Sequence, residues 1–158
     1  EALRLKVASE QYTGDIQYDN AAEASASLLV RGLASSDEAI ARARAYSDAL
    51  GKTSIVVNEA PGLTTSRMSA MAGNEAMWML QEGVATAEDI DTALRLGFNH
   101  PMGPLELADF IGLDTCLSVM QVLHEGLADS KYRPCPLLKE YVAAGRLGRK
   151  TGQGVYTY

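Results

Sequence analysis

Helix start and stop signals divide the sequence from residue 35 onward, and their spacing is the feature that most restricts the fold. Ser35-Ser-Asp-Glu38 has the pattern of a capping box, in which a hydroxyl and a carboxylate bind the free N–H groups of a helix start. Apolar residues then recur at helical spacing as far as Gly51, a residue type that favours a helix end. The short β-branched stretch at 53–58 predicts a strand, which Pro61-Gly62 terminates.

The remaining signals predict a series of helices. The longest is expected over 63–82 and ends before Gly83. Its predicted apolar stripe consists of Met68, Met71, Ala72, Ala76, Met79 and Leu80. The shorter helices are expected to run from a cap at Thr86 to Gly97, over 105–111 after Pro104, from a cap at Asp114, and over 136–144 before Gly145. The sequence therefore predicts a mainly α-helical bundle with a minor strand component.

Residues 1–34 carry weaker signals. The segment 3–7 alternates as a strand does. The segment 20–32 fits a capped helix, which we favour, although the apolar run at 28–30 fits a buried strand equally well. Strand content within 1–34 therefore stays open beside the strand near 53–58.

Composition places the chain among folded, soluble proteins. Hydrophobic residues make up 47% of it and charged residues 22%, whereas disordered chains carry fewer apolar groups. No apolar run is long enough for a membrane span, and the formal net charge of −6 disfavours nucleic acid or an anionic membrane as a partner. Cys116 and Cys135 are too few for a disulfide framework and lack the spacing of a metal site, so we expect a cytoplasmic protein without a metal. A first residue other than Met, Glu1, indicates trimming or excision from a longer chain.

A dinucleotide site is not expected in this chain. Such a site needs Gly-x-Gly-x-x-Gly between a strand and a helix, because the pyrophosphate approaches bare backbone at a helix N-terminus. The early glycines are isolated, and no helix can follow Gly152-Gln-Gly154. Gly148-Arg-Lys-Thr151 lacks the second glycine of a phosphate-binding loop, so a turn with solvated charges is predicted there. We expect the chain by itself to bind no cofactor.

The remaining candidates for reactive residues also have structural explanations. His100 and His124 have no Ser, Cys or carboxylate at a spacing typical of a triad or a metal site, so structural roles are predicted for both. The acidic residues within 88–91 suit the positive end of a helix dipole. Six basic residues and one acidic residue lie within 131–150, and we favour their pairing with acidic helices over phosphate binding.

A set of motifs follows in a fixed order from Pro61 to the end of the chain. The motifs are Pro61-Gly-Leu-Thr-Thr-Ser-Arg67, Asn74-Glu-Ala76, Glu82-Gly-Val-Ala85, Glu88-Asp-Ile-Asp91, Pro101-Met-Gly-Pro-Leu-Glu-Leu-Ala-Asp109, Gly112-Leu-Asp-Thr115, Lys131-Tyr-Arg-Pro134 and Gly145-Arg-Leu-Gly-Arg-Lys-Thr-Gly-Gln-Gly-Val-Tyr156. Together they resemble the C-terminal helical domain of 3-hydroxyacyl-CoA dehydrogenases, especially the bacterial 3-hydroxybutyryl-CoA type. The resemblance begins near Arg31. It implies a helical bundle of the 6-phosphogluconate dehydrogenase C-terminal-like type, with 35–158 as a substrate and dimerisation domain and 1–34 as a divergent segment without a family match.

The resemblance also implies what the complete enzyme does. In this family an N-terminal Rossmann domain binds NAD, and the helical domain closes over the substrate and forms the dimer. The family oxidises the 3-hydroxyl of an acyl-CoA in fatty-acid β-oxidation, or runs the reverse reduction, with a His–Glu pair as the base. The implied partners are therefore a second copy of the chain, an acyl-CoA, and a separate or upstream Rossmann domain.

The chain departs from the family at the proton-transfer positions. The family's Glu position falls on Leu28 and its His position near Ile16, and neither side chain can move a proton. We therefore expect no catalytic residue here. Where the family often has a substrate-contacting Asn, this chain has Ser66, which either donates a hydrogen bond to the substrate or is an ordinary residue of a helix start.

Two hypotheses follow for the function. The first is the substrate-side and dimerisation half of an NAD-dependent 3-hydroxyacyl-CoA dehydrogenase, inactive until a nucleotide-binding partner completes it. The second is a non-catalytic module for dimerisation or acyl-CoA binding. A relative acting on L-gulonate is a further alternative, because such relatives share the helical domain.

Overall fold

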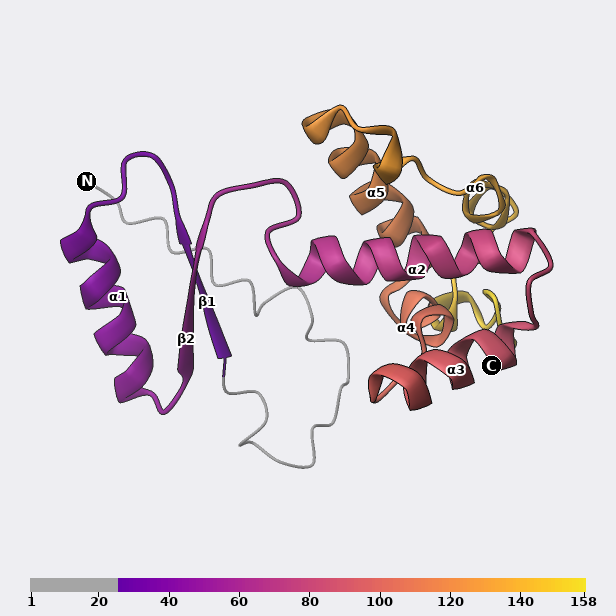
Figure 1. Cartoon of the computed structure of the whole chain (residues 1–158), viewed down its shortest axis with the longest axis horizontal. Helices are drawn as coiled ribbons and strands as arrows, with labels where there is room; N and C mark the ends of the chain where they lie inside the picture. The colour runs from indigo at the N-terminus through magenta and orange to yellow at the C-terminus, as the bar shows by residue number, and fades with distance from the viewer. Residues whose placement is uncertain (1–25) are drawn as a thin grey trace. The chain divides into compact units, whose positions relative to one another are not determined.

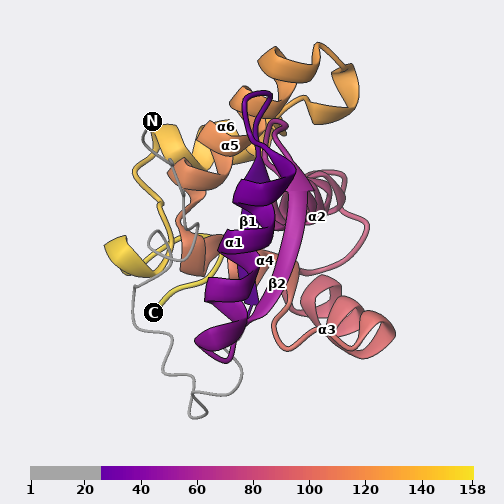
Figure 2. The same cartoon turned by 90° about the vertical axis from the view of Figure 1, so that its left-hand side faces the viewer.

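The computed structural model describes residues 26–158, and these form two compact units that meet in sequence between Leu63 and Thr64. The first unit consists of β1 (Ala26–Arg31), α1 (Asp37–Ala49) and β2 (Thr53–Asn58). The two strands are parallel neighbours, and α1 packs against both of them (Figures 1 and 2). Parallel neighbours cannot be joined by a tight turn, so the crossover helix α1 follows from the pairing.

The favoured helix over 20–32 is wrong for residues 26–31, which form β1. In the register of the pair, Leu28 lies opposite Ile55 and Val30 opposite Val57. The pairing gives the backbone N–H and C=O groups of β1 hydrogen-bond partners in β2, which the strand could not find within itself. Strand content within 1–34, left open by the sequence, is therefore confirmed, as is the strand at 53–58. The strand predicted over 3–7 lies outside the described residues.

The cap of α1 differs by one residue from the expected capping box. Ser36 is the N-cap, and its hydroxyl accepts a hydrogen bond from the Ala39 backbone N–H at 3.1 Å. Ser35 instead closes the preceding turn, where its hydroxyl accepts from the Gly32 N–H at 3.1 Å. Two adjacent serines fit the local pattern equally well, and the turn after β1 decides which one caps the helix.

The second unit is helical and is organised around one central helix (Figure 1). Its elements are α2 (Thr65–Gln81), α3 (Ala87–Phe98), α4 (Pro104–Ile111), α5 (Leu113–Leu127), η2 (Ser130–Tyr132), α6 (Pro136–Ala143) and η3 (Arg149–Thr151). Helix α2 contacts α3, α4, α5 and α6. The predicted mainly helical fold with a small strand component is thus confirmed. The predicted boundary between residues 34 and 35 separates a family domain from a segment without a family match, and it stays a prediction.

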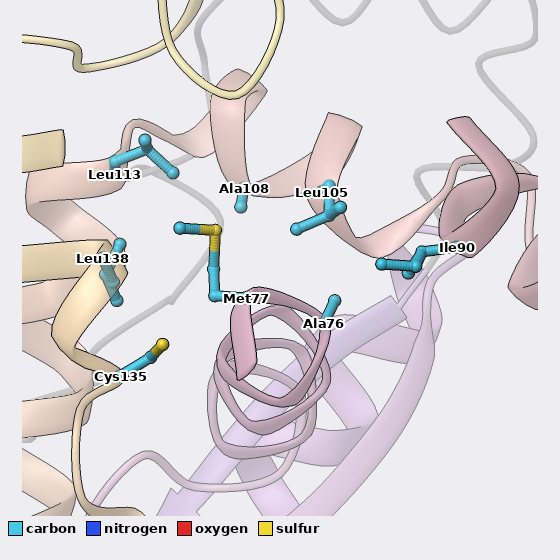
Figure 3. Close-up of a cluster of buried hydrophobic side chains, with 8 residues drawn as sticks. All are labelled: Ala76, Met77, Ile90, Leu105, Ala108, Leu113, Cys135 and Leu138. Atoms are coloured by element: carbon cyan, nitrogen blue, oxygen red, sulfur yellow. The ribbon is translucent and has the colours of Figure 1, made fainter. Parts of the chain in front are cut away.

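The main core cluster of the second unit forms between α2 and the helices around it. Figure 3 shows Met77 reaching from α2 toward Ala108 of α4, among the other side chains of this cluster. The buried members are Ala76, Met77, Ile90, Leu105, Ala108, Leu113, Cys135 and Leu138. A second buried cluster comprises Ala70, Met120, Leu123 and Tyr132. Small residues let the helices approach closely, since a Cβ at Gly73 of α2 would lie 3.7 Å from the Ala108 Cβ.

The predicted apolar stripe of α2 is wrong in part. Met68 is 71% exposed, and the buried residues of the helix are Ala70, Gly73, Asn74, Ala76 and Met77. Methionine and alanine occur around most of α2, so periodicity alone could not select the face. The polar Asn74 belongs to the buried face because it hydrogen-bonds to a distant loop.

Two other helix ends are also corrected. Helix α3 continues past Gly97 to Phe98 and is followed by Asn99 at φ +54°, because asparagine tolerates the left-handed conformation. Helix α5 starts from Gly112 at φ +101°, so Asp114 lies in its first turn and is not its cap. The cap at Thr86, the start of α4 at Pro104 and the stop at Gly145 agree with the sequence. Within residues 26–158, none of the helices has the length and apolar character to cross a membrane.

Candidate functional site

The predicted substrate residue, Ser66, lies in the first turn of α2 and is half-buried. The chain enters this turn through Gly62 at φ +71° and Leu63 at φ +49°, an uncommon conformation for a leucine. The preceding residue, Thr64, makes no side-chain cap hydrogen bond. The backbone N–H groups at this helix start therefore lack the usual local acceptor.

Arg67, next to Ser66, connects α2 to a distant segment. Its guanidinium donates a hydrogen bond to the hydroxyl of Tyr132 and lies 5.1 Å from the centre of that ring. The ammonium of Lys131 lies 5.0 Å from the same ring centre. Two cations therefore contact one buried tyrosine near the start of α2.

Polar side chains farther along α2 hold the segment before α6. The Asn74 amide donates to the Arg133 carbonyl at 3.1 Å and accepts from the Cys135 N–H at 2.8 Å. The Gln81 amide oxygen accepts from the Leu137 N–H at 2.9 Å. Asn74 is only 4% exposed, so both of its bonds form away from water.

Asp91 is a buried carboxylate of α3 that binds the start of another helix, α4. It is 5% exposed and accepts from the N–H groups of Leu105 and Glu106, at 2.8 and 2.9 Å, in the first turn of α4. The Tyr156 hydroxyl donates to it at 2.8 Å. The sequence predicts that Asp91 stabilises the start of its own helix, but the carboxylate binds the start of α4 instead. Asp89 does act locally, because its carboxylate accepts from the hydroxyl of the Thr86 cap at 3.0 Å.

Asp109 is a second buried carboxylate, and it holds the C-terminal segment. It is 1% exposed and accepts from the N–H groups of Val155 and Tyr156, both at 2.9 Å. The Tyr158 hydroxyl donates to it at 3.2 Å. Tyr156 thus binds one carboxylate through its backbone and the other through its hydroxyl.

Burial and the two carboxylates raise the pKa of both tyrosines. For Tyr156, burial has the largest effect, followed by the hydrogen bond to Asp91 and the negative charge of that residue. Burial also raises the pKa of Tyr158. Arg149 lowers this pKa and Asp109 raises it, and the net shift is upward. Both hydroxyls are therefore held as proton donors to the carboxylates and are poorly suited to accept a proton.

The basic segment pairs with acidic residues of the same unit, as favoured from the sequence. Arg149 contacts Glu106 of α4 at 3.0 Å, and Lys150 contacts Asp114 of α5 at 2.5 Å. Their backbone forms a short 3-10 turn, in agreement with the turn predicted at 148–151. These pairs lie on the surface, so each contributes little to stability.

The Lys150–Asp114 pair leads to a pH-dependent prediction. Burial alone would raise the pKa of Asp114, but the hydrogen bond from Lys150 and nearby backbone groups outweigh it and lower that pKa below 3.8. The stabilisation is therefore present above about pH 4 and is lost as the pH falls through the lowered value. Lys150→Met should cost less than about 1 kcal/mol at pH 7 and progressively less as the pH is lowered below about 4, as measured by urea unfolding across this range.

The two cysteines are poor nucleophiles in the folded chain. Burial, with Asp114 and Asp109 as further causes, raises the pKa of Cys116 to about 12. Burial also raises the pKa of Cys135. At pH 8 both thiols should react slowly with Ellman's reagent in the folded chain and at once in urea. Rapid labelling of the folded chain would contradict this assignment.

The turn after β1 is the one place among residues 26–158 where a helix starts directly after a strand of a parallel pair, and it does not fit a dinucleotide. Serine hydroxyls already occupy the Gly32 and Ala39 N–H groups, and Asp37 and Glu38 fill the first turn of α1. A pyrophosphate needs free N–H groups and no competing negative charge. The described residues therefore contain no site for NAD of the glycine-loop type.

The structure also locates the other residues considered from the sequence. Leu28 lies half-buried in β1, and Ile16 lies outside the described residues. His100 is exposed beside the Phe98 ring, with centroids 5.8 Å apart, and His124 is exposed in the last turn of α5. Among residues 26–158, His, Cys, Asp and Glu side chains form no group that could hold a metal ion.

Sequence patterns did not reveal that Tyr132, Asp91 and Asp109 each connect segments that are distant in sequence. Asp109 lies among apolar residues of α4, and a carboxylate in such a position was the available signal. Asp91 shares its side of α3 with Glu88 and Arg95, so it offered no such signal. Tyr132 carried no comparable signal, because its partner Arg67 is 65 residues away.

Comparison with known proteins shows where this chain belongs. The sequence family described as "3-hydroxyacyl-CoA dehydrogenase, C-terminal domain" matches residues 62–158, which include the whole second unit. Over 130 residues, 82% of the chain, it is 56% identical to a probable 3-hydroxybutyryl-CoA dehydrogenase of Bacillus subtilis (strain 168) and 57% identical to the 3-hydroxybutyryl-CoA dehydrogenase of Bradyrhizobium diazoefficiens. These matches cover 45% and 44% of the two relatives, so the chain spans about half their length.

Solved structures give the same result for the fold. The (S)-3-hydroxybutyryl-CoA dehydrogenase of Ralstonia eutropha matches with a TM-score of 0.83 and 52% identity, over 85% of this chain and 47% of that one. The 3-hydroxybutyryl-CoA dehydrogenase of Escherichia coli K12 matches with a TM-score of 0.80 and 35% identity, over 84% of this chain and 28% of that one. The chain therefore belongs to the 3-hydroxyacyl-CoA dehydrogenase family and contains that family's helical C-terminal domain.

Proposed function

We propose that this chain supplies the substrate side of an NAD-dependent 3-hydroxybutyryl-CoA dehydrogenase. The supporting observation is identity above 50% to curated proteins of that name over 130 residues. A four-carbon acyl-CoA is the proposed substrate, and fatty-acid β-oxidation is the proposed setting. NAD is the proposed cofactor of the complete enzyme and binds outside the residues described above.

We propose further that the chain is inactive by itself. Leu28 and the region of Ile16 correspond to the family's Glu and His positions, and neither leucine nor isoleucine transfers protons. The serine-capped turn after β1 supports the same proposal, since it does not fit a pyrophosphate. Activity would then require a second polypeptide or segment that brings both the cofactor site and the base.

Ser66 is the proposed contact to the substrate oxygen. The residue is half-buried at the start of α2, and its hydroxyl can donate a hydrogen bond. Ser66→Ala should weaken the binding of acetoacetyl-CoA about threefold to tenfold, the range of one lost hydrogen bond, in titration calorimetry. Unchanged affinity would show that Ser66 is an ordinary residue of the helix start.

The proposed assembly is a homodimer in the cytoplasm. Several large apolar side chains of the second unit are exposed, among them Leu96 at 80%, Phe98 at 68% and Val122 at 58%. Burial of such side chains against a second subunit would remove apolar area from water and so favour association. Cys116 and Cys135 are both free thiols, which suits a reducing compartment.

A complementation assay tests the proposal. The chain is mixed with a separately expressed Rossmann domain of a 3-hydroxybutyryl-CoA dehydrogenase, and NADH formation from 3-hydroxybutyryl-CoA is followed by absorbance. We expect turnover with both parts and none with either alone. If the two parts associate without turnover while the chain binds acetoacetyl-CoA, a non-catalytic acyl-CoA-binding module is the better description. Turnover by the chain alone would overturn the proposal that it is inactive by itself.

A further inference from the structure

The first turn of α2 lacks the local interactions that usually fix a helix start. Thr64, its N-cap, has φ −106° and ψ −67° and makes no side-chain hydrogen bond, and no acidic residue occurs in the first turn. Arg67 instead puts a positive charge at the positive end of the helix dipole, which is unfavourable by itself. The position of Ser66 must therefore depend on contacts from elsewhere in the unit.

Tyr132 provides such a contact from the buried side. It is 2% exposed and belongs to the second core cluster with Ala70, which lies one helical turn after Ser66. Its hydroxyl accepts the hydrogen bond from Arg67, and its ring faces the guanidinium at 5.1 Å. The contact thus stabilises a cation that the helix start disfavours.

The segment that carries Tyr132 is itself held firmly. Asp129 caps the short η2 turn by accepting from the Lys131 N–H at 3.0 Å. One residue beyond Tyr132, the Arg133 carbonyl accepts from the Asn74 amide at 3.1 Å. Both sides of Tyr132 are fixed, so its hydroxyl can act as a fixed point for Arg67.

We propose that Tyr132 is a positioning residue for the substrate, which it affects by holding Arg67 and with it the turn that carries Ser66. The inference rests on the proposed role of Ser66. Loss of the Tyr132 hydroxyl should leave the ring packed in the core but release the guanidinium. The first turn of α2 would then sample other positions, and Ser66 would meet the substrate oxygen less often.

The test uses the full 158-residue chain and the variants Tyr132→Phe, Ser66→Ala and their combination. Binding of acetoacetyl-CoA is measured by titration calorimetry, and amide hydrogen exchange by NMR. Tyr132→Phe should weaken binding about threefold and speed exchange of the Met68 amide, which donates to the Thr64 carbonyl at 3.1 Å. Amides in the second half of α2 should keep their exchange rates. The double variant should bind no more weakly than Ser66→Ala alone, because Tyr132 acts through Ser66.

Tyr141→Phe is the matched control. Tyr141 of α6 also has a cation over its ring, with the Arg146 guanidinium 3.9 Å from the centroid, but it lies in a different part of the unit. Its substitution should change neither affinity nor the exchange of Met68. If Ser66→Ala weakens binding but Tyr132→Phe does not, or if the two effects simply add, the positioning role is wrong and the proposed function stands. If Ser66→Ala has no effect, the role of Ser66 and with it the positioning role of Tyr132 are wrong, and the proposed function stands. If the unchanged chain does not bind acetoacetyl-CoA, the positioning role and the proposed substrate side are both overturned.

Discussion

Gly148→Ala is expected to lower the free energy of unfolding of the helical unit by about 4 kcal/mol. Gly148 has φ +95° and ψ −149°, a conformation that is essentially restricted to glycine. A Cβ there would also lie 2.1 Å from the Asp109 carbonyl oxygen, and backbone cannot move aside as a flexible side chain can. Strain and collision therefore add at one position. The single tryptophan, Trp78 on α2, reports unfolding of this unit by fluorescence in urea.

Gly145→Ala is the control for this prediction. Gly145 also has a positive φ, +73°, but a Cβ there would meet no atom within 4 Å. Only the backbone strain remains, so the expected loss is about 1 kcal/mol. Equal losses for the two variants would show that the close approach of Gly148 to Asp109 does not exist in solution.

Asp91→Ala is expected to cost about 3 kcal/mol of the same free energy of unfolding. Its removal leaves the Leu105 and Glu106 N–H groups and the Tyr156 hydroxyl without their acceptor, and the site is too buried for water to replace it freely. Tyr156→Phe removes only one of these three bonds and should cost about 1 kcal/mol. Urea unfolding followed by Trp78 fluorescence measures both losses.

Asp89→Ala provides the comparison on the same helix. Asp89 accepts from the Thr86 hydroxyl at 3.0 Å, but this pair is exposed at the helix start. Its loss should cost about 0.5 kcal/mol, since water can replace an exposed bond. A cost for Asp91→Ala as small as that for Asp89→Ala would show that the buried carboxylate does not join α3, α4 and the C-terminal segment.

The resemblance placed Ser66 as a candidate substrate residue, but the sequence could not show what holds it. Local signals near Pro61-Gly62 predict the helix that carries Ser66, and the structure places it in the first turn. The Arg67–Tyr132 contact spans 65 residues of sequence, so no local pattern could predict it. The excess of basic residues within 131–150 predicts that Arg149 pairs with an acidic helix, but only the fold identifies Glu106 as its partner.

Local sequence patterns are enough to identify the helical character of the chain and the family to which it belongs. These patterns involve residues that are close in sequence, so they can be recognised without knowledge of the tertiary structure. Examples are the helix cap at Thr86, the helix stop at Gly145 and the family motifs. Only the folded arrangement shows that 26–31 pairs as a strand, which face of α2 is buried, and which groups bind the carboxylates of Asp91 and Asp109. Those outcomes depend on backbone and side-chain groups that are distant in sequence, and only folding brings them within hydrogen-bonding range.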